Sequence, residues 1–329
     1  MSRPPARRRV FPWVSTLTVV AVGVIGVSAV VVLLRGHDAA APLVERCVAT
    51  SDAGTFPLRL GQADNAALIG TTAVRRGMPA RAATVGIATA MQESSLYNID
   101  YGDRDSVGLF QQRPSQGWGT VEQIMDPVYS TNTFYDALDE VDGWHDMEVT
   151  VAAQTVQRSA FPDAYAQHEG MARAWASALT GWSPAALACT LDDVAEPAPR
   201  DEAVRAFTAR AERDLGFEVV PVDGASGEGS LALTIDATGY GGAAPADAAR
   251  SAWAVGQWAV AVAAGTGVTS VGVADDAWSR DLGAWASQAA DVPDGDPQDD
   301  EAHDGGGQES GPQALPAGTV RVVLAVATP

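Results

Sequence analysis

The 329-residue sequence predicts three parts: an N-terminal single transmembrane helix, a mainly α-helical domain, and a small α/β domain at the C-terminus. Three observations predict this fold class. An uncharged apolar run stands near the start, and apolar residues at helical spacing fill the chain up to residue 190. Strand-like runs around Ala-rich segments follow residue 203. The apolar fraction of 47% allows such domains to form hydrophobic cores.

The first part covers residues 1–35, an Arg-rich tip followed by the apolar run. Val14 to Leu34 are 21 residues without charge, about 31 Å of helix, which matches the hydrocarbon thickness of a bilayer. Because positive charge stays on the cytoplasmic side, the tip predicts a signal-anchor in the cell membrane with the bulk of the chain outside the cytoplasm. A cleaved signal peptide is the alternative, since Ala39–Ala41 supply small residues for cleavage; the protein would then be secreted.

Residues 36–46 read as a tether, after which Cys47 and Cys189 bracket the second part. In an oxidising compartment these two cysteines are expected to form a disulfide. With only two Cys and four His, and without zinc-site spacing, the sequence predicts no metal and no cofactor. The formal charge of −20 argues against nucleic acid as a partner, because phosphate binding needs a basic surface.

The helices and strands are predicted from the spacing of apolar residues and from Gly and Pro residues at their ends. Helices are expected in residues 47–190 at 65–76, 81–95, 127–140, 149–158 and 169–180. Residues 191–202 read as a linker. Residues 203–329 are expected to hold helices at 203–215 and 244–264, strands at 231–235, 268–273 and 319–326, and a disordered acidic loop at about 291–315.

The segment from Ala88 to Pro114 carries the chemistry. Its first half is a predicted helix that ends at Glu93, where the negative end of the helix dipole favours a neutral carboxyl group. A glutamic acid that keeps its proton near neutral pH can act as a general acid. The second half is a Gly-containing turn, which would bring backbone groups and the Gln111 amide close to a ligand.

At these residues the chain resembles the lysozyme-like superfamily, most closely soluble lytic transglycosylases and goose-type lysozymes. The shared features are a helix ending in Glu-Ser and, some fifteen residues later, a Ser-x-x-Gly-Leu-Phe-Gln turn. The resemblance covers about residues 60–180 and implies a lysozyme-like fold with Glu93 as the catalytic acid/base. It also implies saccharide contacts in the two motifs, at Ser94, Ser106, Gly108, Phe110 and Gln111.

The chain departs from this family in one motif. Lytic transglycosylases usually have a later Ala-Tyr-Asn-Ala-Gly stretch that lines the cleft, and the nearest stretch here, residues 152–162, lacks its Tyr and Asn. Gln154, Gln157 or Tyr165 can supply the polar contacts instead. Ordinary helix surface is the alternative for these positions.

A glycosidase with two carboxylates would need a partner for Glu93. The local candidates are Asp100, Asp103 and Asp105, in a stretch that reads instead as a solvated loop held by Arg104. A lone Glu fits the transglycosylase route. In that route it protonates the glycosidic oxygen and then takes the proton of the substrate's own C6 hydroxyl, which yields a 1,6-anhydro sugar.

Residues 203–329 resemble the C-terminal domain that accompanies actinobacterial cell-wall hydrolases, in Trp253 to Trp258, 267–271, 276–278 and 284–285. The terminal strand lacks the His residues of that domain, so a packing or recognition module is expected. We therefore expect a membrane-anchored peptidoglycan lytic transglycosylase or muramidase that cleaves the β-1,4 bond between N-acetylmuramic acid and N-acetylglucosamine. The alternative is a non-catalytic envelope protein of the same fold that binds glycan or a protein partner.

Overall fold

The structure of the chain, a computed structural model, describes residues 44–159, 161, 163–216, 227–242, 244–288 and 314–328. Its helices and strands are, in chain order, β1 (Arg46–Ser51), β2 (Gly54–Leu58), α2 (Leu60–Arg75), α3 (Ala80–Ser94), α4 (Val121–Ile124), α5 (Pro127–Asp139), α6 (Val149–Gln157), α7 (Glu169–Leu179), β3 (Leu187–Thr190), α8 (Arg200–Leu215), β4 (Ser230–Asp236), α9 (Ala248–Ala261), α10 (Ala263–Thr266), β5 (Val268–Val273), β6 (Asp276–Ser279), β7 (Ala284–Ser287) and β8 (Thr319–Ala325). Short 3-10 helices include η1 (Pro114–Gln116) and η2 (Ala166–His168).

The first sheet joins the two ends of the region that the cysteines bracket. Its three strands are antiparallel in the order β2-β1-β3, and Cys47 stands directly opposite Cys189. The two cysteines form a disulfide across 142 residues, which confirms the predicted pairing. Because β1 precedes the helices and β3 follows them, the bond holds the entry and the exit of this region together.

The five helices expected before residue 190 are present as α2, α3, α5, α6 and α7. Their contacts are close because small residues stand where the helices meet. A Cβ at Gly86 of α3 would lie 2.9 Å from both Ile69 Cγ2 and Tyr135 Oη, so only glycine allows this approach. The Tyr135 hydroxyl donates to the Ile69 carbonyl at 2.9 Å and so satisfies its polar atom inside the core.

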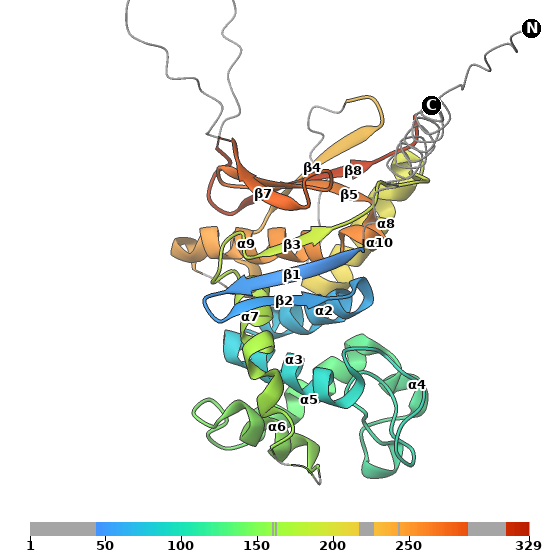
Figure 1. Ribbon diagram of the computed structural model, residues 1–329, viewed down its shortest axis with the longest axis vertical. Helices are drawn as coiled ribbons and strands as arrows, with labels where there is room; N and C mark the ends of the chain where they lie inside the picture. The colour runs from blue at the N-terminus through green and yellow to red at the C-terminus, as the bar shows by residue number, and fades with distance from the viewer. Residues whose placement is uncertain are drawn as a thin grey trace, which may run out of the picture. The chain divides into compact units, whose positions relative to one another are not determined.

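The second sheet has five antiparallel strands in the order β4-β8-β5-β6-β7. One face packs on α9, which in turn packs on β3, α2 and α7. Figure 1 shows α9 below this sheet, at the level of β3. Nearly every residue of α9 is buried, as expected for a helix that is apolar on all sides.

Polar side chains connect the layers around α9. Gln257 is fully buried, accepts the Leu187 amide at 2.8 Å, and donates to the carbonyls of Ala178 and Ser183. Trp278 and Trp285 donate their indole N–H groups to carbonyls of β3. These bonds fasten the five-stranded sheet to the end of the helical region, and the described residues accordingly cluster as one compact unit.

The predicted fold class is therefore wrong. The described residues form a mixed α/β structure with two sheets, not a mainly α domain beside a separate small α/β domain. The sequence analysis missed β1, β2 and β3 because these strands are short and lack clear alternation, and it missed β6 and β7 for the same reason.

The expected transmembrane helix stays a prediction. Within the described ranges, no helix combines the length and the hydropathy that crossing a bilayer requires. The run from Val14 to Leu34 lies outside these ranges, as do residues 289–313, which hold most of the expected acidic loop.

Candidate active site

Helix α3 carries Glu93 in its last turn. The helix ends at two consecutive residues in the left-handed region, Ser95 at φ 54° and Leu96 at φ 60°. Their amides donate to the carbonyls of Met91 and Ala90 and close the helix C-terminus. The chain therefore turns away immediately after Glu93, and the carboxyl group is left half-buried at the end of the helix.

Tyr165 is the direct partner of Glu93. Its hydroxyl donates to Glu93 Oε1 at 2.6 Å, and its side chain has no exposed surface. Burial, followed by the contact with Glu93, raises the pKa of Tyr165 far above its usual value, so the phenol keeps its proton and remains a donor. Of the three polar candidates that the sequence suggested near residues 152–165, the structure brings this one to the carboxylate.

The segment that carries Tyr165 is also fastened to the residue before Glu93. Gln92 Oε1 accepts from Gln167 Nε2 at 3.1 Å and lies 3.0 Å from His168 Nε2. Burial lowers the pKa of His168, which favours the neutral ring. The sequence analysis missed Gln92 and Gln167, because neither belongs to a recognisable motif.

The turn of residues 106–111 lies against the same helix end. Ser94 Oγ donates to the Leu109 carbonyl at 2.7 Å and to the Ala90 carbonyl at 3.1 Å. Gly108 has φ 81°, and a Cβ there would lie 2.8 Å from the Ile124 carbonyl oxygen, so the turn requires glycine. Ser94 and Gly108 thus hold the turn beside Glu93.

Gln111 stands at the end of this turn, and its amide bonds backbone groups of the protein. Its amide donates to the carbonyls of Tyr101 and Gly108, both at 3.2 Å, and its backbone has φ 48°. The Gln111 side chain is half-buried. The segment whose carbonyl it bonds carries the exposed ring of Tyr101. Tyr101 and the exposed Tyr97 are aromatic residues that the sequence analysis did not single out.

Three predicted substrate contacts are corrected. Phe110 is fully buried and stacks on Phe134 at a centroid distance of 4.5 Å, so its side chain supports the turn from the core. Ser94 and Ser106 are also buried, each at 8% exposure. Since these side chains lie inside the protein, none of the three offers a surface to a glycan.

The two glutamines of α6 bind backbone groups. Gln157 Nε2 donates to the Phe110 carbonyl at 2.8 Å and so positions the turn from its other side. Gln154 Nε2 donates to the Ser159 carbonyl at 2.6 Å, beyond the end of the helix. Gln157 therefore belongs to the site through the turn, whereas Gln154 holds the loop that leads to Tyr165.

The local aspartates are either held by partners of their own or exposed on the loop. Asp105 accepts from Arg113 Nε at 2.7 Å and from the Ser115 amide at 2.8 Å. Asp103 lies 3.8 Å from Arg104, with both side chains exposed, and Asp100 is exposed as well. Arg113, rather than the expected Arg104, holds the loop at Asp105.

Asp105→Asn is expected to flatten the acid end of the stability profile. The hydrogen bonds from Ser115 and Arg113 hold the pKa of Asp105 well below its usual value. A carboxyl group whose pKa is lower in the folded state contributes stability above about pH 4, and this contribution is lost as the pH falls further. Thermal unfolding midpoints from pH 7 to pH 2 should therefore fall more steeply in the wild type than in the variant. Parallel curves would contradict the expectation.

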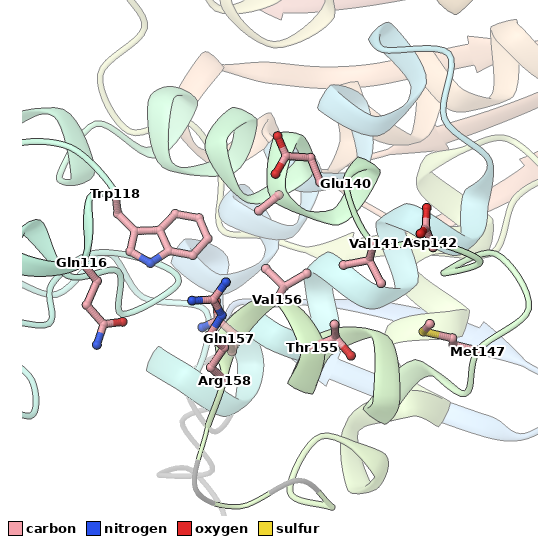
Figure 2. Close-up of a pocket in the computed structure, with 11 residues that line it drawn as sticks. Gln116, Trp118, Glu140, Val141, Asp142, Met147, Thr155, Val156, Gln157 and Arg158 are labelled. Atoms are coloured by element: carbon pink, nitrogen blue, oxygen red, sulfur yellow. The ribbon is translucent and has the colours of Figure 1, made fainter.

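A pocket of about 820 Å³ lies between the C-terminal ends of α5 and α6 (Figure 2). We call it the α5–α6 pocket. Its polar and aromatic lining includes Gln116, Trp118, Glu140, Asp142, Gln157 and Arg158. Gln157 joins it to the site, because this lining residue also bonds the turn at Phe110 through its amide.

Neither a scan of protein-family models nor a search of curated proteins finds a match to the chain. No group of His, Cys, Asp and Glu among the described residues could hold a metal ion. Glu93, Tyr165 and the adjoining turn therefore make up the candidate site.

Proposed function

We propose that this protein is a peptidoglycan lytic transglycosylase that acts outside the cytoplasm. It would cleave the β-1,4 bond between N-acetylmuramic acid and N-acetylglucosamine, with Glu93 as general acid and base. The observation that carries the proposal is the half-buried Glu93 carboxyl group, held at 2.6 Å by the hydroxyl of the buried Tyr165 beside the Gln111 turn. The disulfide supports an oxidising compartment.

A single carboxyl group is sufficient for the reaction. Glu93 first donates its proton to the glycosidic oxygen, and the bond between that oxygen and C1 of N-acetylmuramic acid breaks. The resulting carboxylate then removes the proton of the substrate's C6 hydroxyl, whose oxygen forms a new bond to C1. The product is a 1,6-anhydro sugar, Glu93 regains its proton, and no water is consumed.

A second candidate is a glycan-binding protein without catalysis. It is favoured by the glutamines of α6, which bond backbone groups in place of the Tyr and Asn of the missing family motif. The two candidates share the site around Glu93 and differ in whether the bound strand is cut.

Product analysis separates these candidates. Full-length protein is incubated with purified peptidoglycan in ¹⁸O-labelled water, and the soluble products are examined by mass spectrometry. The transglycosylase predicts products with unlabelled 1,6-anhydro ends. Labelled reducing ends would identify a hydrolase, and binding to the sacculus without soluble products would identify the binding protein.

Tyr165→Phe is expected to lower kcat by about ten- to a hundredfold and to leave KM nearly unchanged. The substitution removes one charge-assisted hydrogen bond to Glu93, a contribution of about 1.5–3 kcal/mol, and keeps the buried ring. Tyr165 is thus a positioning residue that acts through Glu93. Steady-state rates on peptidoglycan strands measure the effect, and Tyr97→Phe, which alters an exposed tyrosine, is the matched control. An equal loss in both variants would exclude this role for Tyr165.

A further inference from the structure

The α5–α6 pocket adjoins the candidate active site through the turn of residues 106–111. Ser94, the neighbour of Glu93, bonds the turn at Leu109, and Gln157 bonds it at Phe110. The pocket wall therefore begins one residue from Gln111. The turn thus contacts the end of helix α3 on one side and a residue of the pocket lining on the other.

The pocket holds charged groups of both signs that are free to bind a ligand. Arg158, Glu140 and Asp142 are exposed, and no ion pair joins any of them to another described residue. Figure 2 shows Arg158 at the end of α6 and Glu140 on a different segment of the lining. Because an uncharged sugar would leave these groups unpaired, they favour a ligand with both a carboxylate and an amine.

Trp118 gives the pocket an apolar surface. Its ring is half-buried and packs against the core, while its backbone carbonyl accepts from the Tyr129 hydroxyl at 3.2 Å, which fixes the residue's position. Among the described residues, none bonds its indole N–H. Such a ring can pack against the aliphatic part of a ligand and donate one hydrogen bond at its edge.

We propose that the α5–α6 pocket binds the peptide stem that branches from the glycan strand. Arg158 pairs with a carboxylate of the stem, Glu140 and Asp142 pair with its amine, and Trp118 packs against the aliphatic chain between them. A volume of about 820 Å³ is suited to a few amino-acid residues. This inference rests on the proposed function, because the stem reaches the pocket only when the strand lies at Glu93.

Binding measurements with the Glu93→Gln protein test the proposal, since this variant is expected to leave bound strands intact. The probes are a tetrasaccharide of alternating N-acetylglucosamine and N-acetylmuramic acid with its peptide stems, and the same tetrasaccharide after the stems have been removed enzymatically. Calorimetry on the full-length protein gives both Kd values. The stems are expected to tighten binding about tenfold.

Two substitutions in the pocket should remove this preference. Arg158→Ala and Trp118→Ala, each added to Glu93→Gln, are expected to bring the two Kd values within about threefold of each other without weakening binding of the stripped tetrasaccharide. Arg158 is exposed, so its variant cannot act through the core. Arg205→Ala and Trp182→Ala, which alter exposed residues outside the pocket, are the matched controls.

Three results would contradict the inference, and they differ in what else they affect. Equal Kd values for the two probes before the pocket is altered would show that no stem is recognised. An equal loss for both probes in Arg158→Ala would assign the pocket to sugar. In either case the proposed function stands, whereas failure of both probes to bind would overturn the proposed function as well.

Discussion

Glu93→Gln is expected to lower the rate of peptidoglycan cleavage by about a thousandfold, a typical contribution of a general acid and base. The amide cannot supply or take up the proton that the reaction transfers. Its oxygen can still accept from the Tyr165 hydroxyl, which now lies 2.6 Å from the carboxylate, so the arrangement of α3 and the Tyr165 segment should persist. Initial rates of muropeptide release, measured by chromatography, give the effect.

Two neighbouring carboxylates are the controls for this prediction. Asp100→Asn and Asp103→Asn change exposed groups on the loop after α3 and should leave the rate within about threefold of the wild type. A loss in either variant as large as that in Glu93→Gln would point to a two-carboxylate mechanism. A Glu93→Gln protein with more than a tenth of the wild-type rate would remove Glu93 from the chemistry.

The double substitution of Cys47 and Cys189 by Ala is expected to lower the free energy of unfolding by about 4–5 kcal/mol. The bond closes a loop of 142 residues, and a long loop loses much conformational entropy in the unfolded state when it is cross-linked. Both sulfur-bearing side chains are buried in the first sheet, on strands that pair directly. Denaturant unfolding of both proteins without reductant measures the difference.

Unfolding in the presence of reductant distinguishes the contribution of the cross-link to stability from that of side-chain packing. Full reduction of the wild type should bring its stability close to that of the double variant, and should leave the double variant unchanged. A difference below about 1 kcal/mol between the oxidised wild type and the double variant would mean that the three-stranded sheet holds the two chain ends without the bond.

The helices could be predicted from the sequence because apolar residues at helical spacing recur along α2, α3, α5, α6 and α7. The starts of α5, α6 and α7 coincide with the predicted ones, and the other bounds differ by one to five residues. The strands of the first sheet could not be predicted in this way. Arg46–Ser51 has no strong alternation, and its pairing with β3 depends on residues about 140 positions later in the chain.

The architecture was misjudged for a related reason. The Ala-rich helix at 248–261 reads as an ordinary element of a separate C-terminal domain, but both of its faces are covered, one by the five-stranded sheet and one by β3, α2 and α7. The composition of a helix shows that it is apolar but not which elements cover it. The two sheets that pack on α9 were therefore predicted to belong to two separate domains.

Some parts of the candidate site could likewise be predicted from the sequence, whereas others depend on tertiary packing. The sequence by itself determined the local parts, the helix that ends at Glu93 and the glycine-dependent turn that carries Gln111, because both depend on residues close together in the chain. Only the tertiary structure decided that Tyr165 meets Glu93 across 72 positions and that Phe110 lies in the core. Helix ends and turns follow from short-range sterics and hydrogen bonds, whereas the choice of a partner for a carboxyl group depends on how distant segments pack.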